Sequence, residues 1–161
     1  MNTFKKHLTG WSITIILLLF LAGCTGTEPC GNGIEDRTPI AAEDLIAPDS
    51  GVLTLQNIDE SQDEVNLVLL SWQDFENYVE SSMELPAIDF SKQVVLAGRK
   101  KWHQCIGFSG YSVQAGCRKV FYRVYLDQMD CLMLESVTFF TVISREAASG
   151  KVEFEIVVNQ T

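Results

Sequence analysis

The sequence predicts an α+β fold, built as a mainly antiparallel β-meander sheet with one amphipathic helix packed on it. Residues 71–83 carry large apolar side chains at helical spacing, and most of the chain after residue 90 has the composition and period of β-strands. The connections between these strands are too short for crossover helices, which favours hairpins. With 161 residues, 47% hydrophobic and 20% charged, the chain has the composition of a modest globular protein.

The predicted helix begins after Ser71. Large apolar residues at positions 72, 75, 79 and 83 form one stripe along a helix. Ser71 is a suitable N-cap, Asp74 lies favourably near the positive end of the helix, and Pro86 prevents continuation beyond about Glu84. Because a short helix is stabilised mainly by burying such a stripe, we expect it to pack on the sheet.

The strands are predicted from runs of β-branched and aromatic residues. In the last run, Val, Phe, Ile and Val at positions 152, 154, 156 and 158 alternate with polar residues, as expected for a strand with one buried face. The predicted strands cover residues 93–98, 111–115, 119–126, 137–143 and 152–158, with edge strands at 64–70 and 52–56.

The N-terminus has the features of an export signal. Lys5 and Lys6 precede an apolar run at residues 11–22, which is too short to cross a bilayer comfortably. The following Leu21-Ala22-Gly23-Cys24 resembles the bacterial lipobox. This resemblance implies a signal peptide at 1–23 and a lipoprotein anchored in the cell envelope through acyl chains, such as palmitate, on Cys24. Thr25 after the cysteine implies the periplasmic face of the outer membrane if the host has two membranes.

Composition divides the rest of the chain into two parts. Residues 24–39 are rich in Gly and Pro and predict a flexible tether, whereas residues 40–161 stay apolar enough for a single α+β globular domain. The chain has 12 basic and 21 acidic residues, a net charge of −9, so we expect no nucleic-acid partner.

Two short motifs suggest a family. Residues 86–96 contain Ile88-Asp89-Phe90 before a strand, and Gly107-Phe108-Ser109-Gly110-Tyr111 precedes another. With the final strand pair, this order resembles the PrcB-like domain, named for a protease-complex subunit, over about residues 70–158. The family's usual turn is T-G-G-Y-x-I, so Ser109 replaces a Gly and the usual Thr is absent. The resemblance implies a non-enzymatic accessory or protein-binding role, with an envelope protein or a protease as partner.

The motif at 107–111 supplies the candidate partner-binding residues. Phe108 and Tyr111 at a loop tip would suit a partner because aromatic side chains bury much area with few rotamers. In the other interpretation, Gly107 and Gly110 serve the turn by adopting positive φ and Tyr111 packs in the core.

Four cysteines remain after lipidation of Cys24, in an oxidising compartment. In a meander, Cys105 and Cys131 lie at the same end of the sheet, so we predict a disulfide between them. Cys30 then forms a second disulfide with Cys117 or remains free.

The spacings between the cysteines include no C-x-x-C pair, so we predict no metal site and no cofactor. His103 and Cys105 would share a strand face, but a catalytic pair needs a reduced thiol.

No common catalytic motif occurs in the sequence, and we predict that the protein is not an enzyme. The alternative is an envelope hydrolase or small-molecule-binding protein whose site no motif marks. The basic run Arg99-Lys100-Lys101 has two interpretations: a charged strand end that discourages edge pairing, or a docking point for an acidic partner or lipid headgroup.

Overall fold

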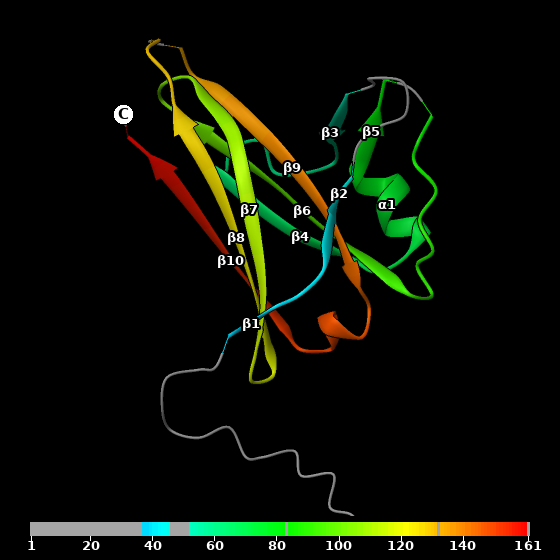
Figure 1. The fold of residues 1–161 in the computed structure, drawn as a ribbon. Helices are drawn as coiled ribbons and strands as arrows, with labels where there is room; N and C mark the ends of the chain where they lie inside the picture. The colour runs from blue at the N-terminus through cyan, green and yellow to red at the C-terminus, as the bar shows by residue number, and fades with distance from the viewer. Residues whose placement is uncertain (1–36, 46–51, 83, 132, 161) are drawn as a thin grey trace, which may run out of the picture.

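A computed structural model describes residues 37–45, 52–82, 84–131 and 133–160. These residues form two four-stranded sheets packed face to face, with one helix and a two-stranded sheet on the outer side of the second (Figure 1). The second sheet is therefore the middle layer.

The first sheet, sheet A, contains the predicted hairpin and the C-terminal strand. Its strand order is β1 (Thr38–Pro39), β7 (Ile106–Gly116), β8 (Lys119–Gln128), β10 (Lys151–Asn159). β7 and β8 are antiparallel, whereas β10 runs parallel to β8 with Lys151 opposite Lys119. A parallel neighbour is possible here because the intervening strand lies in the other sheet.

The second sheet, sheet B, is antiparallel throughout. Its order is β2 (Ala42–Asp44), β9 (Glu135–Ser144), β6 (Gln93–Trp102), β4 (Glu64–Leu69). The chain passes between the sheets from β6 to β7 and from β8 to β9 at one end of the molecule. It passes back at the other end through the 3-10 turn η2 (Ala147–Ser149), which precedes β10.

The helix α1 (Trp72–Tyr78) begins as predicted. The Ser71 hydroxyl accepts a hydrogen bond from the Asp74 amide at 3.1 Å. The helix ends sooner than its apolar stripe suggests, because the chain becomes extended at Val79 and forms β5 (Val79–Ser81) against β3 (Leu53–Leu55). Pairing with β3 satisfies the backbone groups that a longer helix would have used.

Sheet B separates two hydrophobic cores. Val94 and Leu96 of β6 face the core between the sheets, whereas Val95 and Ala97 face the core beneath α1 and β3. Burial on both faces explains why this strand is a continuous apolar run rather than an alternating one. Between the sheets, the Tyr122 hydroxyl on β8 lies 2.7 Å from the Thr141 hydroxyl on β9.

The α+β class, the antiparallel character and the single described helix agree with the prediction from sequence. Each predicted strand overlaps an observed strand, and none extends more than one residue beyond the end of the observed one. The connectivity differs from one continuous meander, because the strands divide between two sheets and the last one pairs in parallel. The end of the predicted tether also differs: Thr38 and Pro39 form β1 on β7.

Candidate functional site

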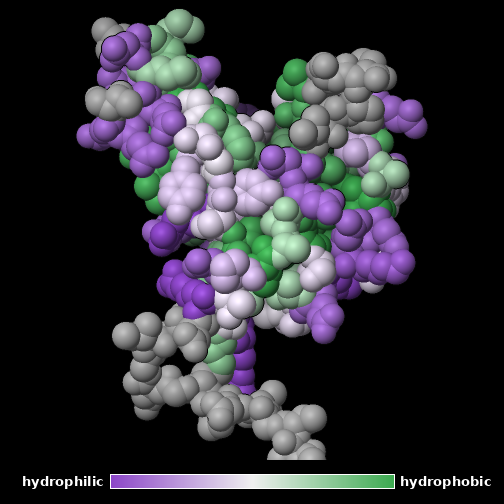
Figure 2. All heavy atoms as spheres, viewed as in Figure 1, coloured by the Kyte–Doolittle hydropathy of each residue, from purple (hydrophilic) through white to green (hydrophobic). Residues whose placement is uncertain are grey.

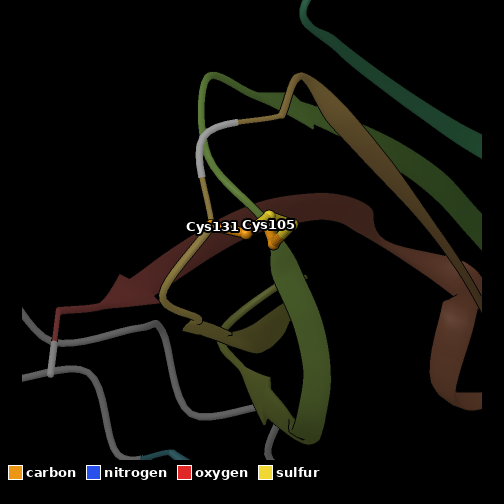
Figure 3. The surroundings of a disulfide bond; sticks show 2 residues. All are labelled: Cys105 and Cys131. Carbon is orange, nitrogen blue, oxygen red and sulfur yellow. A yellow bond between two sulfur atoms is a disulfide. The ribbon is translucent and has the colours of Figure 1, made fainter.

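The predicted disulfide between Cys105 and Cys131 is present (Figure 3), with Cα atoms 5.4 Å apart. Cys105 precedes β7 and Cys131 follows β8, so the bond joins the two connections that carry the chain between the sheets. The Met129 amide reinforces it by donating to the Cys105 carbonyl at 2.8 Å. Cys117 is also disulfide-bonded, and Cys30 lies outside the described residues.

The motif at 107–111 is not the turn that its glycines predict, because all of it lies within β7. The register against β8 shifts between Phe108 and Gly110, which is a β-bulge, and Gly110 has φ +151. A glycine is suited to a bulge for the same reason that it is suited to a turn, since both can require positive φ.

The bulge places the two candidate aromatic residues on the same face of β7, opposite Leu126 and Val124, with their ring centroids 6.4 Å apart. Phe108 is exposed, whereas Tyr111 is half-buried and packs edge-on against Tyr122 at 6.0 Å between ring centroids. Burial, followed by the Asp44 carboxylate, raises the pKa of Tyr111. Tyr111 therefore belongs to the margin of the core, as the packing interpretation expected, and Phe108 is the more exposed of the two.

The disulfide end of the molecule carries four exposed apolar side chains. Phe108 is 45% exposed, Met129 48%, Met133 68% and Leu134 75%. We call these four residues the apolar tip. They are four of the seven large apolar side chains that are exposed among the described residues. Figure 2 shows apolar side chains at this end, over the connection between β8 and β9.

The backbone next to Phe108 is also accessible within the described part of the chain. β1 pairs with β7 only at Gln114 and Ala115, and the Ile40 amide adds a bond to the Val113 carbonyl. Between residues 106 and 112, no described strand pairs with the edge of β7 that faces away from β8. An open edge of this kind can accept an extended segment of another chain.

A shallow pocket of about 280 Å³ lies beside the tip, lined by Asp63, Lys100, Lys101, Trp102, His103 and Leu134. His103 and Asp63 are exposed, and the His103 ring lies against Trp102 at 4.8 Å between centroids. Since Cys105 is held in a disulfide, its thiol cannot act with His103 as a nucleophilic pair.

The basic run 99–101 is part of the interior rather than a strand edge. β6 lies between β9 and β4, so the expectation that these charges discourage edge pairing is wrong. Arg99 is 4% exposed and donates to the Glu60 carboxylate and to the carbonyls of Asp59 and Gln62. The bond from Arg99 lowers the pKa of Glu60. Arg99 therefore fastens residues 59–62 to the sheet.

Lys101 is paired with the segment before β4, and Lys100 with the first residue of β4. The Lys100 ammonium lies 3.0 Å from the Glu64 carboxylate, and the Lys101 ammonium lies 3.4 Å from the Glu60 carboxylate. Both side chains are mostly buried, which leaves little of either cation for an external ligand.

The apolar tip is the feature that the sequence analysis missed, apart from Phe108. Its signal was the segment Met129-Asp130-Cys131-Leu132-Met133-Leu134, which is apolar yet belongs to neither neighbouring strand pattern. An apolar loop next to a cysteine can indicate an exposed surface that a disulfide holds in place.

Other predicted features lie beyond what the structure describes. The signal peptide at 1–23, Cys24 and most of the tether are outside the described residues. Within the described ranges, no helix is long and apolar enough to cross a membrane. Across the same ranges, no group of three or more His, Cys, Asp or Glu side chains is placed to hold a metal ion.

Comparison of the chain with protein-family models, with curated proteins and with solved structures finds no match in any of the three.

Proposed function

We propose that this protein is a lipid-anchored envelope protein that acts as a non-enzymatic binding module, and that its partner docks on the apolar tip. The observation that carries the proposal is the exposure of Met133 and Leu134, at 68% and 75%, on a loop held by the Cys105–Cys131 disulfide. Exposed apolar side chains gathered at one place are typical of interaction sites, and methionine adapts to irregular partner surfaces.

The constrained loop also favours binding on entropic grounds. Both connections at this end are joined by the disulfide, so the loop has fewer conformations to lose when a partner docks. Asp130 and Glu135 are exposed beside the apolar side chains. The partner that fits is therefore an envelope protein with an apolar cleft and a basic rim.

The adjacent pocket is a weaker basis for the enzymatic or small-molecule alternative. It contains one acidic residue, Asp63, and this side chain is exposed rather than buried. A catalytic carboxylate usually has its pKa adjusted by burial or by a close partner. The lysines of the pocket are engaged by Glu60 and Glu64. The arrangement thus favours a docking surface over a reaction site.

Site-specific photo-crosslinking in intact cells tests this proposal. A photoreactive amino acid replaces Met133 in one variant and Leu70 in the control, because both positions are exposed and apolar but Leu70 lies outside the tip. We expect one discrete crosslinked protein from position 133 and none from position 70. The double variant Met133→Ser, Leu134→Ser, crosslinked from Phe108, should lose that product while its thermal unfolding is unchanged. The same products from positions 133 and 70 would contradict the proposal.

A further inference from the structure

The edge of β7 that faces away from β8 is covered along only part of its length. β1 pairs with it at Gln114 and Ala115, and the Ile40 amide donates to the Val113 carbonyl at 3.1 Å. The chain then leaves for sheet B, where β2 pairs with β9 (Figure 1). Residues 106–112 on this side of β7 have no paired strand among the described residues, and we call them the open edge.

The backbone groups of the open edge point toward a missing neighbour. The Val113 carbonyl faces this side, and in an antiparallel ladder every second residue directs its amide and carbonyl the same way. Tyr111 and, beyond the bulge, Phe108 follow this alternation and face outward. Within the described part of the chain, no strand supplies hydrogen-bond partners for these two residues on the open side.

The bulge also brings two aromatic rings onto one side of the open edge. Phe108 and Tyr111 share the core-facing side of β7, although an interval of three residues would put them on opposite faces of a regular strand. Val113 lies on the same side, where the chain after β1 covers the edge, and is 4% exposed, whereas Phe108 is 45% exposed. The core between the sheets is therefore closed where a strand covers this edge and accessible where none does.

The open edge has neither charged residues nor proline, two of the features that usually prevent strand pairing. The other edge of sheet A is β10, which differs in this respect. Lys151, Glu153 and Glu155 alternate along β10, and each is held in an ion pair with its own strand or with β8. Strand pairing is thus discouraged at β10 and not at the open edge.

The elements that border the open edge are acidic. β2, β7, β9 and the connection 129–134 contain no lysine or arginine, and residues 45–51, which follow β2, add one aspartate and no base. Arg37, before β1, lies over the Phe121 ring at the far end of β7. The bases of β6 and β8 are ion-paired with carboxylates. The exposed acids of the bordering elements are Glu43, Asp44, Asp130 and Glu135.

We propose that the partner of this protein adds an extended segment to sheet A as a strand on the open edge. This inference deepens the proposed function and rests on its binding role. The segment that fits has apolar side chains on one face, which cover Phe108 and Tyr111, and lysine or arginine side chains that meet the surrounding acids. About seven residues are enough, since residues 106–112 span about 23 Å. β1 already occupies the same edge in this way within the chain.

Hydrogen exchange of the mature lipidated protein with a defined peptide tests the proposal. The probe is a capped peptide of four Val-Lys repeats. One control has the same composition with the four valines before the four lysines, and the other consists of four Val-Glu repeats. At about ten times its dissociation constant, the probe should slow exchange of the Phe108 and Tyr111 amides about tenfold and leave those of β10 unchanged. Neither control should protect them, because one lacks an apolar face and the other has the wrong charge.

Variants of exposed apolar residues test the contact of the peptide with Phe108. Phe108→Ser should weaken peptide binding about tenfold, whereas Phe108→Leu should weaken it less than about threefold. Leu70→Ser is the control, because Leu70 is 46% exposed but lies before α1, and it should leave the affinity unchanged. Thermal unfolding of each variant establishes that the fold is intact.

A second pair of variants tests the charge of the surroundings. Glu43→Gln with Glu135→Gln should weaken binding of the basic peptide and reduce its dependence on salt. Glu76→Gln with Glu80→Gln removes two exposed acids from α1 and β5 instead, and should leave both unchanged.

The outcomes that overturn strand addition are distinct from those that overturn the apolar tip. Protection confined to residues 129–134, protection of the β10 amides, equal protection by the peptide with consecutive valines, or no protection at all would each overturn strand addition. Absence of a crosslinked product from Met133 in cells, with Phe108 and Tyr111 still protected by the probe, would refute the tip as the docking point but not the addition of a strand.

Discussion

Tyr122 and Thr141 form a polar contact in the core between the two sheets. The Tyr122 side chain is fully buried, Thr141 is 1% exposed, and their hydroxyl oxygens lie 2.7 Å apart. One residue is on β8 and the other on β9, so this bond joins sheet A to sheet B. A buried hydroxyl that loses its partner remains desolvated without compensation, which makes each member of the pair sensitive to replacement of the other.

We expect Tyr122→Phe to lower the free energy of unfolding by about 1–2 kcal/mol, because the Thr141 hydroxyl is left unsatisfied. Thr141→Val should act similarly. The double variant should cost less than the sum of the single changes, since the second replacement removes the orphaned group. Urea unfolding of the four proteins measures this cycle, and strictly additive losses would show that the two hydroxyls are not coupled.

The same tyrosine predicts a loss of stability in alkali. Burial raises the pKa of Tyr122 above its usual value, while the bond to Thr141 acts in the opposite direction. The folded protein therefore keeps the phenol protonated after the unfolded chain has begun to ionise, at about pH 10. Stability should be complete below that pH and fall as pH rises above it. Urea midpoints from pH 8 to 11 should fall less steeply for Tyr122→Phe than for the native chain.

Two glycines of β7 predict opposite responses to the same substitution. A Cβ on Gly107 would make an ordinary contact with Met129 at 3.5 Å, whereas Gly110 has open space around it but a φ of +151. Gly110→Ala should therefore cost about 1–3 kcal/mol through backbone strain alone, and Gly107→Ala should be nearly neutral. Thermal unfolding measures both, and a neutral Gly110→Ala would mean that the bulge can adopt another conformation.

At the scale of elements, the disulfide is the main constraint on the apolar tip. It closes a chain segment with a sequence separation of 26 between Cys105 and Cys131. The same segment includes β7 and β8, so both the hairpin and the tip depend on it.

We expect the double variant Cys105→Ala, Cys131→Ala to lose about 3 kcal/mol of unfolding free energy in the chain-entropy description. It should also be cut faster by protease at residues 129–134, because the loop is no longer held to β7. Urea unfolding and limited proteolysis measure the two effects. A stable variant with an unchanged cleavage pattern would show that backbone bonds alone hold the tip, among them the Met129 amide to the Cys105 carbonyl.

Strands and disulfide could be predicted from the sequence because both depend on local pattern and strand direction. β8 has the expected alternation, with Val120, Tyr122, Val124 and Leu126 buried. The Cys105–Cys131 pair follows from the up-and-down course of β6, β7 and β8, and this course is the same in a meander and in two stacked sheets.

Sheet assignment could not be predicted in the same way, because it depends on which distant strand supplies the partner. Nothing local to Val79 shows that it will leave the helix for β5, since its pairing partner in β3 is 24 positions earlier. The expectation of positive φ is correct for Gly110 and wrong for Gly107, and a bulge and a turn share the requirement that Gly110 meets. The apolar segment 129–134 was a sequence signal for the tip, but which of its side chains are exposed is known only from the structure.

At the scale of the whole molecule, the start of the described chain and the proposed docking site lie at opposite ends. β1 leaves sheet A beside the β7–β8 turn, and Met133 lies in the connection at the far end of β8 (Figure 1). If the chain is anchored ahead of Arg37, as we propose, we expect the apolar tip to face the compartment rather than the membrane.

The anchor itself gives a direct prediction. Cys24→Ala should abolish incorporation of a labelled palmitate analogue and leave the precursor uncleaved, because the thiol that receives the lipid is missing. Metabolic labelling and gel mobility in the native host measure both effects, with the double variant of Cys105 and Cys131 as a control that retains Cys24. Labelling of the Cys24→Ala chain would contradict the lipobox resemblance.

The strand pairings also determine when the chain can fold. Thr38 pairs with Ala115, 77 positions later, Gln93 pairs with Ser144, 51 positions later, and sheet A is complete only when the last nine-residue strand joins β8. Pairings between distant residues make folding slow, because loops must close before their contacts form. For a chain with an export signal, as its first residues predict, slow folding keeps the precursor unfolded and competent for translocation until its C-terminus has been synthesised.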